Sequence, residues 1–223
     1  MRNSKLSAPF GSFFYIERDK RWKMIVKILD ITESPCDAIA LAAGTSYGKF
    51  DTNEKRVKNI IKAGHLSCTE FAYIHFRIEG ISRSCLAQLT RHRLMSFCVE
   101  SQRYNKYSSL MDDWYVIPPE IEADPDKKLV YQAKMEKDMK DYESFLFHGV
   151  KPEDARFLLP EATKTKLSCA MNLREFYSFL KLRLDPHAQW EIRMLAQKMY
   201  DEVCSYNDQW KALMDYYWEY IQE

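Results

Sequence analysis

The chain has 223 residues, of which 46% are hydrophobic and 14% aromatic, which is enough to bury a full core and excludes a disordered chain. Lys and Arg together number 33 against 32 Asp and Glu, so the formal net charge is only +1. This balance argues against broad nucleic-acid or membrane binding by charge alone, but it permits a small anionic ligand held by a few Arg residues. No apolar window approaches the ~18 residues of a membrane span.

The cysteines and histidines are scattered through the sequence. None of the six Cys forms a Cys-x-x-Cys pair, and the five His show no ligand spacing, so the sequence predicts no metal site. Scattered Cys residues behind a start without an apolar signal segment are typical of a reduced, cytoplasmic protein.

The first part of the chain predicts an extension, a strand and a helix. Residues 1–23 are Ser-rich with several aromatics, and we expect them to form an N-terminal extension packed on the rest of the protein. The apolar, β-branched run over residues 24–31 predicts a strand. The Ala-rich residues 37–43 predict a helix, which residues 44–47 are expected to break.

A second helix is expected to begin at Asp51 and Glu54, which stand at capping-box spacing, and to end at Gly64 as a left-handed cap. A polar loop is expected over residues 65–70. Residues 71–79 then alternate between apolar and polar side chains, which is typical of a half-buried antiparallel strand. Gly80 is expected to turn the chain at the end of that strand.

A basic motif follows the next predicted helix, which Ser82 is expected to cap and which extends to about Arg91. Gln88, Arg91 and His92 are spaced to share one face of it. The run Arg91-His92-Arg93 clusters cations that repel one another unless an anion or a carboxylate lies between them, and the planar fork of Arg matches phosphate oxygens. The alternative interpretation is a solvated basic helix end, where cations complement the helix dipole.

The middle of the chain predicts alternating short elements. A strand is expected over residues 114–119, and a long helix is expected to begin with Asp124 as its cap and to end at Gly149. Another helix is expected between Pro152 and Pro160 with Arg156 inside it. A further strand is expected over residues 165–171.

The last part of the chain predicts three helices. Asn172 and Glu175 are spaced as a capping box for the first, which extends to about Leu182. Asp185 is expected to cap the second, and Arg183 stands just before the positive end of that helix, an unusual place for a cation unless an anion is near. The third spans residues 208–222. Without repeats or linkers, the sequence predicts one α+β domain over residues 1–223, with an antiparallel sheet packed with helices and long C-terminal helices.

The residues alone leave the chemistry open. No Gly-rich phosphate loop occurs, so a bound dinucleotide would be held by side chains and helix ends. Ser101 could act as a nucleophile with His92 as its base, but no acidic partner at a recognisable spacing supports a triad.

Three blocks of sequence resemble the flavin-dependent thymidylate synthases. The signature is Arg91-His92-Arg93, seven residues, Ser101, then Arg103-Tyr104, and Gln88 precedes it by three residues as in that family. The run from Arg183 to Glu191 also matches, and the resemblance covers roughly residues 24–205. It implies the fold of that family and an FAD-dependent methyltransferase. Such an enzyme makes dTMP from dUMP, with methylenetetrahydrofolate as carbon donor and FAD reduced by NADPH as hydride source.

The resemblance also implies a set of site residues. Arg183, which would stabilise negative charge on the uracil ring, Ser101, which would position dUMP, and His65, near flavin and folate, are the implied catalytic residues. The implied dUMP ligands are Gln88, Leu89, Thr90, Arg91, Val99, Glu100, Ser101, Gln102, Arg103, Arg156 and Arg183. The implied FAD ligands are Ser46, Ser67, Arg91, His92, Arg93, Val99, Asn172, Arg174 and Ser178.

The resemblance further implies a homotetramer whose active sites are shared between subunits. Three positions depart from the family pattern: Cys98 stands where Asn or Ser is usual, Val99 where Glu or Gln is usual, and Ser178 where Asn or His is common. They motivate a second hypothesis, a relative that forms another modified deoxyuridylate such as a 5-hydroxymethyl product. A third hypothesis is a non-catalytic nucleotide-binding or RNA-binding protein, and a fourth is a thymidylate synthase that uses Cys98 as its nucleophile.

Overall fold

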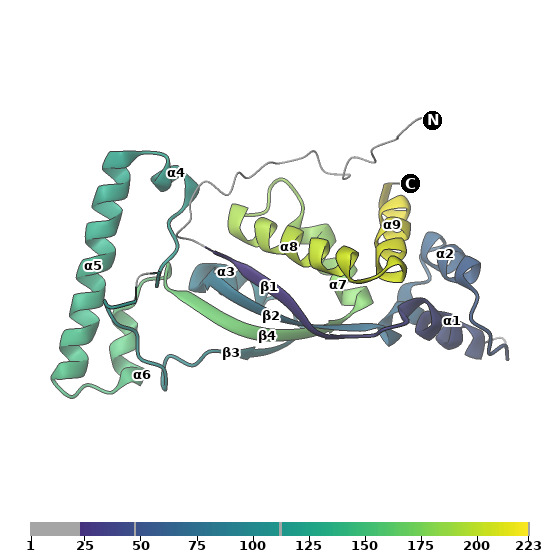
Figure 1. The fold of residues 1–223 in the computed structure, drawn as a ribbon, viewed down its shortest axis with the longest axis horizontal. Helices are drawn as coiled ribbons and strands as arrows, with labels where there is room; N and C mark the ends of the chain where they lie inside the picture. The colour runs from purple at the N-terminus through teal and green to yellow at the C-terminus, as the bar shows by residue number, and fades with distance from the viewer. Residues whose placement is uncertain (1–22, 47, 112, 223) are drawn as a thin grey trace. The chain divides into compact units, whose positions relative to one another are not determined.

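Four strands form one sheet in the order β1-β2-β4-β3 (Figure 1). The computed structural model describes residues 23–46, 48–111 and 113–222, so the expected extension lies outside the described residues except for Lys23. The strands are β1 (Ile25–Ile31), β2 (Tyr73–Ser82), β3 (Ser96–Val99) and β4 (Lys164–Asn172). Together with the helices they confirm the predicted α+β class.

Backbone hydrogen bonds show why the central strands are antiparallel. Leu173, just after β4, donates its N–H to the carbonyl of Ala72, just before β2, at 2.8 Å. At the other ends of the same strands, Arg83 donates to the carbonyl of Thr163 at 3.0 Å. The end of each strand therefore meets the start of the other, which is the pairing of an antiparallel ladder.

The described chain divides into two compact units. Unit 1 contains residues 26–76 and those from Ala170 onward, and unit 2 contains residues 23–25 and 77–169. The expectation of one domain over residues 1–223 stays a prediction. Within the described residues, no helix is both long and apolar enough to cross a membrane.

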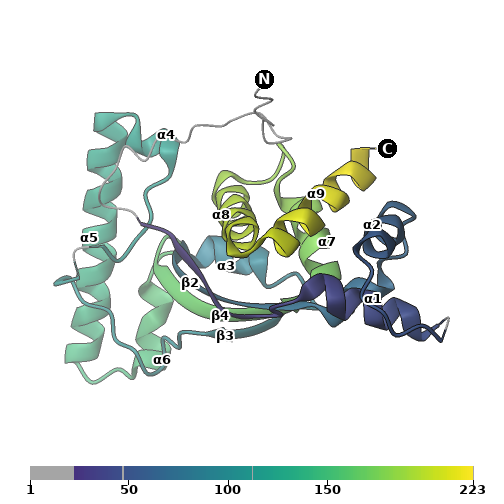
Figure 2. The same cartoon turned by 45° about the vertical axis from the view of Figure 1, so that its right-hand side comes forward.

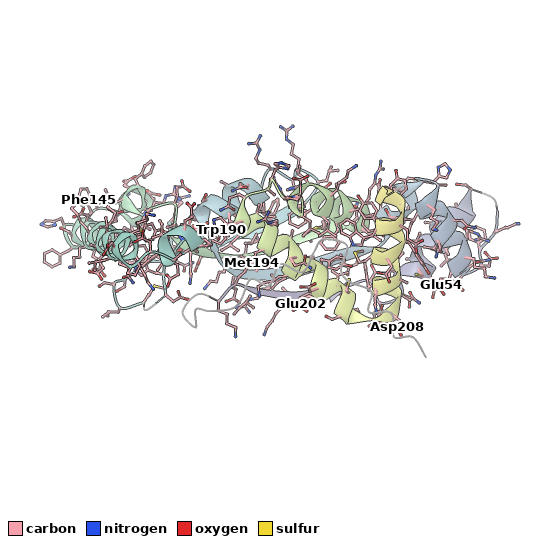
Figure 3. All side chains as sticks on the ribbon, turned by 90° about the horizontal axis from the view of Figure 1, so that it is seen from above. Glu54, Phe145, Trp190, Met194, Glu202 and Asp208 are labelled. Carbon is pink, nitrogen blue, oxygen red and sulfur yellow. The ribbon has the colours of Figure 1, made fainter. Side chains whose placement is uncertain are left out.

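Unit 1 is mainly helical. Its helix α9 packs against α8, α2 and α1 (Figure 2), and its helix α7 packs against α8 and η1. Figure 3 shows Trp190, Met194 and Glu202 along α8 and Asp208 at the start of α9. The helices are α1 (Pro35–Thr45), α2 (Glu54–Lys62), the 3-10 helix η1 (Leu66–Phe71), α7 (Leu173–Arg183), α8 (Trp190–Tyr206) and α9 (Asp208–Gln222).

The core of unit 1 follows the predicted periodicities. Phe76 from β2 and Phe176 from α7 are both fully buried, with ring centroids 5.8 Å apart. The expected buried stripe of the long helix is confirmed, because four apolar residues one turn apart on α8 have no exposed surface: Ile192, Leu195, Met199 and Val203. Burial of such side chains contributes about 1.5–3 kcal/mol each.

Unit 2 is built around the long helix α5 (Pro125–Phe147), which Asp124 caps by accepting hydrogen bonds from the N–H groups of Asp126 and Lys127. Figure 3 marks Phe145 near its C-terminal end. Met135, Met139 and Tyr142 face a core that also holds Tyr107 and Trp114. The other helices of unit 2 are α3 (Arg83–Leu89), α4 (Pro119–Glu122), α6 (Pro152–Ala155) and the 3-10 helix η2 (Arg156–Leu158).

Several predicted boundaries in unit 1 were wrong. Gly44 and Thr45 belong to α1 rather than breaking it. The cap of α2 is Asn53, whose side chain accepts from the N–H of Arg56, and not Asp51. The expected polar loop after Gly64 folds instead as η1, although Gly64 does adopt the predicted left-handed conformation, with φ of 73°.

Gly80 does not turn the chain, because β2 continues through it to Ser82. Its φ is 78°, and a Cβ atom there would lie 2.5 Å from the carbonyl oxygen of Lys23. A glycine in this strand therefore permits a close backbone approach that any side chain would block. Gly80 does adopt the positive φ that is typical of a turn, but it does so inside a strand.

Three further elements differ from expectation. The helix expected between Pro152 and Pro160 ends at Ala155, and Arg156 begins the 3-10 helix η2 instead. The predicted strand over residues 114–119 is reduced to one isolated bridge between Tyr115 and Thr163, and Pro119 begins α4. Asp185 does not cap α8, because that helix begins at Trp190 with Gln189 as its cap. Asp185 instead accepts from the backbone N–H of His187 at 2.8 Å, within the connection that joins α7 to α8.

Candidate functional site

A cavity of about 390 Å³ in unit 2 brings together two arginines and a buried amide. Arg83 is the first residue of α3, Arg156 follows α6, and Gln102 is 7% exposed. Two guanidinium groups and an amide form a donor-rich wall suited to an anion. The cavity is lined by Arg83, Gln102, Arg156, Phe157, Leu159, Pro160 and Glu161.

Glu153 connects Arg156 to another arginine of the predicted set. Its carboxylate oxygen Oε2 accepts a hydrogen bond from Nε of Arg103 at 3.0 Å and lies 2.9 Å from Nη2 of the same guanidinium. Its backbone carbonyl accepts from Nε of Arg156 at 3.0 Å. One residue of α6 thus contacts both guanidinium groups, which lie far apart in the sequence.

Ser101 begins a tight turn that holds Arg103. The Ser101 hydroxyl accepts from the N–H of Arg103 at 3.3 Å, and its carbonyl accepts from the N–H groups of Tyr104 and Asn105. Because the Oγ acts as an acceptor here, its own proton remains to be donated to a ligand. The arrangement favours the interpretation of Ser101 as a positioning hydroxyl.

Glu100 stands beside that turn and is tied to strand β4. Its carboxylate lies 3.1 Å from Nζ of Lys166, and its N–H donates to the Lys166 carbonyl at 2.9 Å. The nearby phenol of Tyr107 donates to the carbonyl of Lys164. Burial, with the charge of Glu100 as the next cause, raises the pKa of Tyr107 to about 12, so this phenol stays neutral.

The basic motif lies beyond the end of α3, so the predicted shared face of Gln88, Arg91 and His92 was wrong. The helix ends at Leu89 and Thr90 closes it. Arg91 is exposed whereas His92 is only 8% exposed, so the two neighbours have different surroundings.

The other predicted dUMP ligands near the motif divide into core and surface residues. Leu89 is fully buried, and only its backbone can serve a ligand; its carbonyl accepts from the N–H of His92 at 3.1 Å. The hydroxyl of Thr90 donates to the carbonyl of Leu86. Gln88 and Val99 are half-buried. Arg93, which was predicted as a flavin ligand, and Cys98, which departs from the family pattern, are exposed.

Five of the nine predicted flavin ligands lie in unit 1: Ser46, Ser67, Asn172, Arg174 and Ser178. Nη1 of Arg174 lies 2.5 Å from Oε1 of Glu70, which ties α7 to η1. The hydroxyl of Ser178 donates to the Arg174 carbonyl one turn earlier. Asn172 caps α7 by accepting from the N–H of Glu175 at 2.9 Å, which leaves its side-chain NH2 as a donor.

The chemistry of this donor set fits a flavin dinucleotide. Arg174, Ser46, Ser67 and His65 are exposed, whereas the exposed Ser178 already donates its one hydroxyl proton to the Arg174 carbonyl. Hydroxyl, amide and guanidinium donors are the groups that hold a diphosphate. The described residues of unit 1 can therefore supply donors to such a cofactor.

Arg183 occupies a different position from the one expected. It is the last residue of α7 and half-buried, and α8 begins only at Trp190. A cation there complements the negative end of its own helix and does not oppose the positive end of the next. The physical reason for expecting an anion beside Arg183 was thus wrong, and its assignment depends on the resemblance.

Sequence reasoning did not single out Arg83 or Glu153. Arg83 directly follows the capping residue Ser82, so it stands at the positive end of α3. The arrangement predicted at Arg183, a cation at the positive end of a helix, is present at Arg83 instead. No pattern signalled Glu153, because its partner Arg103 lies on a distant segment.

The chain matches the family described as thymidylate synthase complementing protein over residues 27–206. It is 38% identical over 195 residues to the flavin-dependent thymidylate synthase of Pyrococcus furiosus, covering 82% of this chain and 80% of that protein. It is also 38% identical over 189 residues to the protein of the same name from Geobacter sulfurreducens, covering 79% and 80%.

A solved structure agrees with these sequence matches. The crystal structure of thymidylate synthase X from Helicobacter pylori with FAD and dUMP superposes with a TM-score of 0.70 and 25% identity, covering 87% of this chain and 99% of that one. Most of both chains is matched in sequence and in fold. This chain belongs to the thymidylate synthase complementing protein family, that of the flavin-dependent thymidylate synthases.

Proposed function

We propose that this chain catalyses the reductive methylation of dUMP to dTMP. Methylenetetrahydrofolate is the carbon donor, and FAD reduced by NADPH is the hydride source. The observation that carries the proposal is the cavity in unit 2, which Arg83, Arg156 and the buried Gln102 all line. Family membership supports the reaction, and the arginines of the cavity support the assignment of an anionic nucleotide to it.

The phosphate of dUMP is assigned to the arginine wall. Guanidinium groups stay charged at all working pH values and present forked donors that match phosphate oxygens. The Ser101 hydroxyl and the Arg103 guanidinium belong to one turn, so both are available to the same end of the ligand. Arg83 thereby joins the predicted dUMP ligands, and Gln88, Arg91 and Gln102 stay among them.

Arg183 is assigned to the uracil ring. A permanently charged guanidinium stabilises negative charge that develops on the ring, and it does so without giving up a proton. When bound, the reduced flavin supplies the hydride. His65, exposed at the start of η1, stays assigned to the neighbourhood of flavin and folate.

The remaining assignments extend the same proposal. The flavin ligands are those named from the resemblance, with Arg174, Asn172 and Ser67 as the described donors of unit 1. We propose a homotetramer with shared active sites and a cytoplasmic location. The location is supported by the six cysteines, all of which are free thiols.

Flavin content and NADPH oxidation test the proposal. The purified protein, reconstituted with FAD, should show flavin absorption and should oxidise NADPH faster when dUMP is added. A protein that binds no FAD, or whose NADPH oxidation is indifferent to dUMP, would contradict the proposed function. RNA binding that weakens with salt in a flavin-free protein would instead favour the RNA-binding hypothesis.

A further inference from the structure

We infer that Glu153 is a positioning residue that orients Arg103 and Arg156 toward the phosphate of the nucleotide. The inference rests on the proposed function, because it assigns an acidic residue to an anion site. Glu153 lies on α6 and touches Arg103 through its carboxylate and Arg156 through its carbonyl. Among the described residues, it is the one that makes hydrogen bonds with both guanidinium groups.

The geometry at Arg103 leaves donors for a second anion. Oε2 of Glu153 accepts a hydrogen bond from Nε and forms an ion pair with Nη2, and a guanidinium has five N–H groups. Nη1 and at least one hydrogen of Nη2 therefore remain available to a ligand. The carboxylate fixes the plane of the guanidinium along one edge, and fixing a long side chain in advance reduces the entropy lost when a ligand binds.

The geometry at Arg156 is similar. Its Nε is used by the Glu153 carbonyl at 3.0 Å, and its two terminal nitrogens remain available at the cavity. The same carbonyl contact persists in any side-chain variant of Glu153. A substitution of Glu153 therefore changes the contact with Arg103 directly, and it affects Arg156 only if α6 itself moves.

A purely competing role for Glu153 predicts the opposite change in dUMP affinity. If Glu153 only competed with the phosphate for Arg103, its removal would raise the positive charge of the site and tighten dUMP binding. If it positions Arg103, its removal weakens dUMP binding in spite of the more favourable charge. The sign of the change in affinity separates the two roles.

Glu153→Gln is the test, with Asp154→Asn as its matched control. Asp154 is the exposed acidic neighbour on α6, so the control removes the same charge and leaves Arg103 untouched. Calorimetry on the FAD-loaded protein would measure the affinity for dUMP and for deoxyuridine, which lacks the phosphate. Thermal unfolding of both variants would show that each is folded.

Positioning predicts that Glu153→Gln weakens dUMP about three- to fivefold, the size expected for an exposed ion pair, and leaves deoxyuridine unchanged. The KM for dUMP should rise with kcat unchanged, and Asp154→Asn should behave as the unmodified protein. Unchanged or tighter dUMP binding by Glu153→Gln would overturn the inference, and so would an equal loss for both ligands. If the unmodified protein bound no dUMP, the proposed function itself would fail.

Discussion

Arg83 and Arg156 line one cavity because the start of α3 is docked on the segment that follows η2. The N–H of Arg83 donates to the carbonyl of Thr163 at 3.0 Å, and the N–H of Ser84 donates to the carbonyl of Glu161 at 3.1 Å. These backbone bonds hold the start of α3 to residues 161–163, which follow the 3-10 helix that carries Arg156, and they do not depend on side chains. The cavity is therefore expected to persist when either arginine is replaced.

Replacing Arg83 tests the anion site. Arg83→Ala should weaken dUMP binding about tenfold to a hundredfold, since hydrogen bonds to charged groups contribute about 1.5–3 kcal/mol. Calorimetry with dUMP measures the loss. The matched control is Arg77→Ala, an exposed arginine of β2 that is paired with Glu79 at 2.5 Å and does not line the cavity. If the Arg83→Ala protein bound dUMP with unchanged affinity, Arg83 would not be a ligand of dUMP.

Asn172 combines two roles that substitutions can separate. Asn172→Ala should destabilise the protein by about 1 kcal/mol, because the cap on the Glu175 N–H is lost. Asn172→Asp keeps the capping oxygen and should retain stability, but it loses the amide donor and should bind FAD more weakly. Urea unfolding and flavin titration measure the two effects. Equal stability of all three proteins would contradict the capping role.

The hydrogen bonds that Glu143 accepts in unit 2 are expected to make the stability of the protein sensitive to acid. Its carboxylate accepts from the N–H of Ser109 at 2.7 Å, and this bond, more than those from the Ser109 and Ser108 hydroxyls, lowers the pKa of Glu143. The native state therefore takes up this proton less readily than the unfolded state. The contribution to stability is complete at neutral pH and is lost as pH falls through the usual range of Glu toward the lower native pKa.

Glu143→Gln checks this dependence. Urea unfolding at neutral pH and near pH ~4 should show a smaller loss of stability on acidification in the variant than in the unmodified protein. Glu136→Gln, an exposed substitution on the same helix, serves as the control. An identical pH dependence in all three proteins would show that Glu143 contributes nothing through this linkage.

Thiol chemistry tests the hypothesis that Cys98 is a nucleophile. Cys98 is exposed, whereas burial raises the pKa of Cys169 to about 12, so a thiol reagent should label Cys98 and spare Cys169 in the native protein. Cys98→Ala should retain dTMP synthesis, because the proposed reaction uses no enzyme thiolate. Loss of turnover in a folded, flavin-loaded Cys98→Ala protein would revive the cysteine-dependent mechanism.

Elements with local signals could be predicted from the sequence. The alternation around Ile74 and the stripe through Leu195 indicated the correct buried faces, and Asp124 and Asn172 cap their helices as expected. These features depend on side chains within a few residues of one another. The α+β class followed from them together with the strand over residues 165–171.

Features set by distant segments could not be predicted. Gly80 carries the local signal of a turn, and only the approach of Lys23 shows why the strand continues through it. Asp185 carries the local signal of a helix cap, yet Gln189 caps the helix instead. The ion pair between Arg103 and Glu153 depends on where α6 lies, which no local pattern records. Matched sequence motifs indicated the proposed reaction. Arg83, in contrast, is identified as a candidate ligand only by the cavity that it lines.

Transfer of an isotopically labelled methylene group to the pyrimidine is the most direct test of the proposed function. The FAD-loaded protein would be given dUMP, NADPH and labelled methylenetetrahydrofolate, and the nucleotide product would be identified by mass spectrometry. The proposed reaction predicts dTMP with the label in its methyl group, formed only when NADPH is present. A 5-hydroxymethyl product, or unchanged dUMP in a protein that binds both flavin and nucleotide, would contradict it.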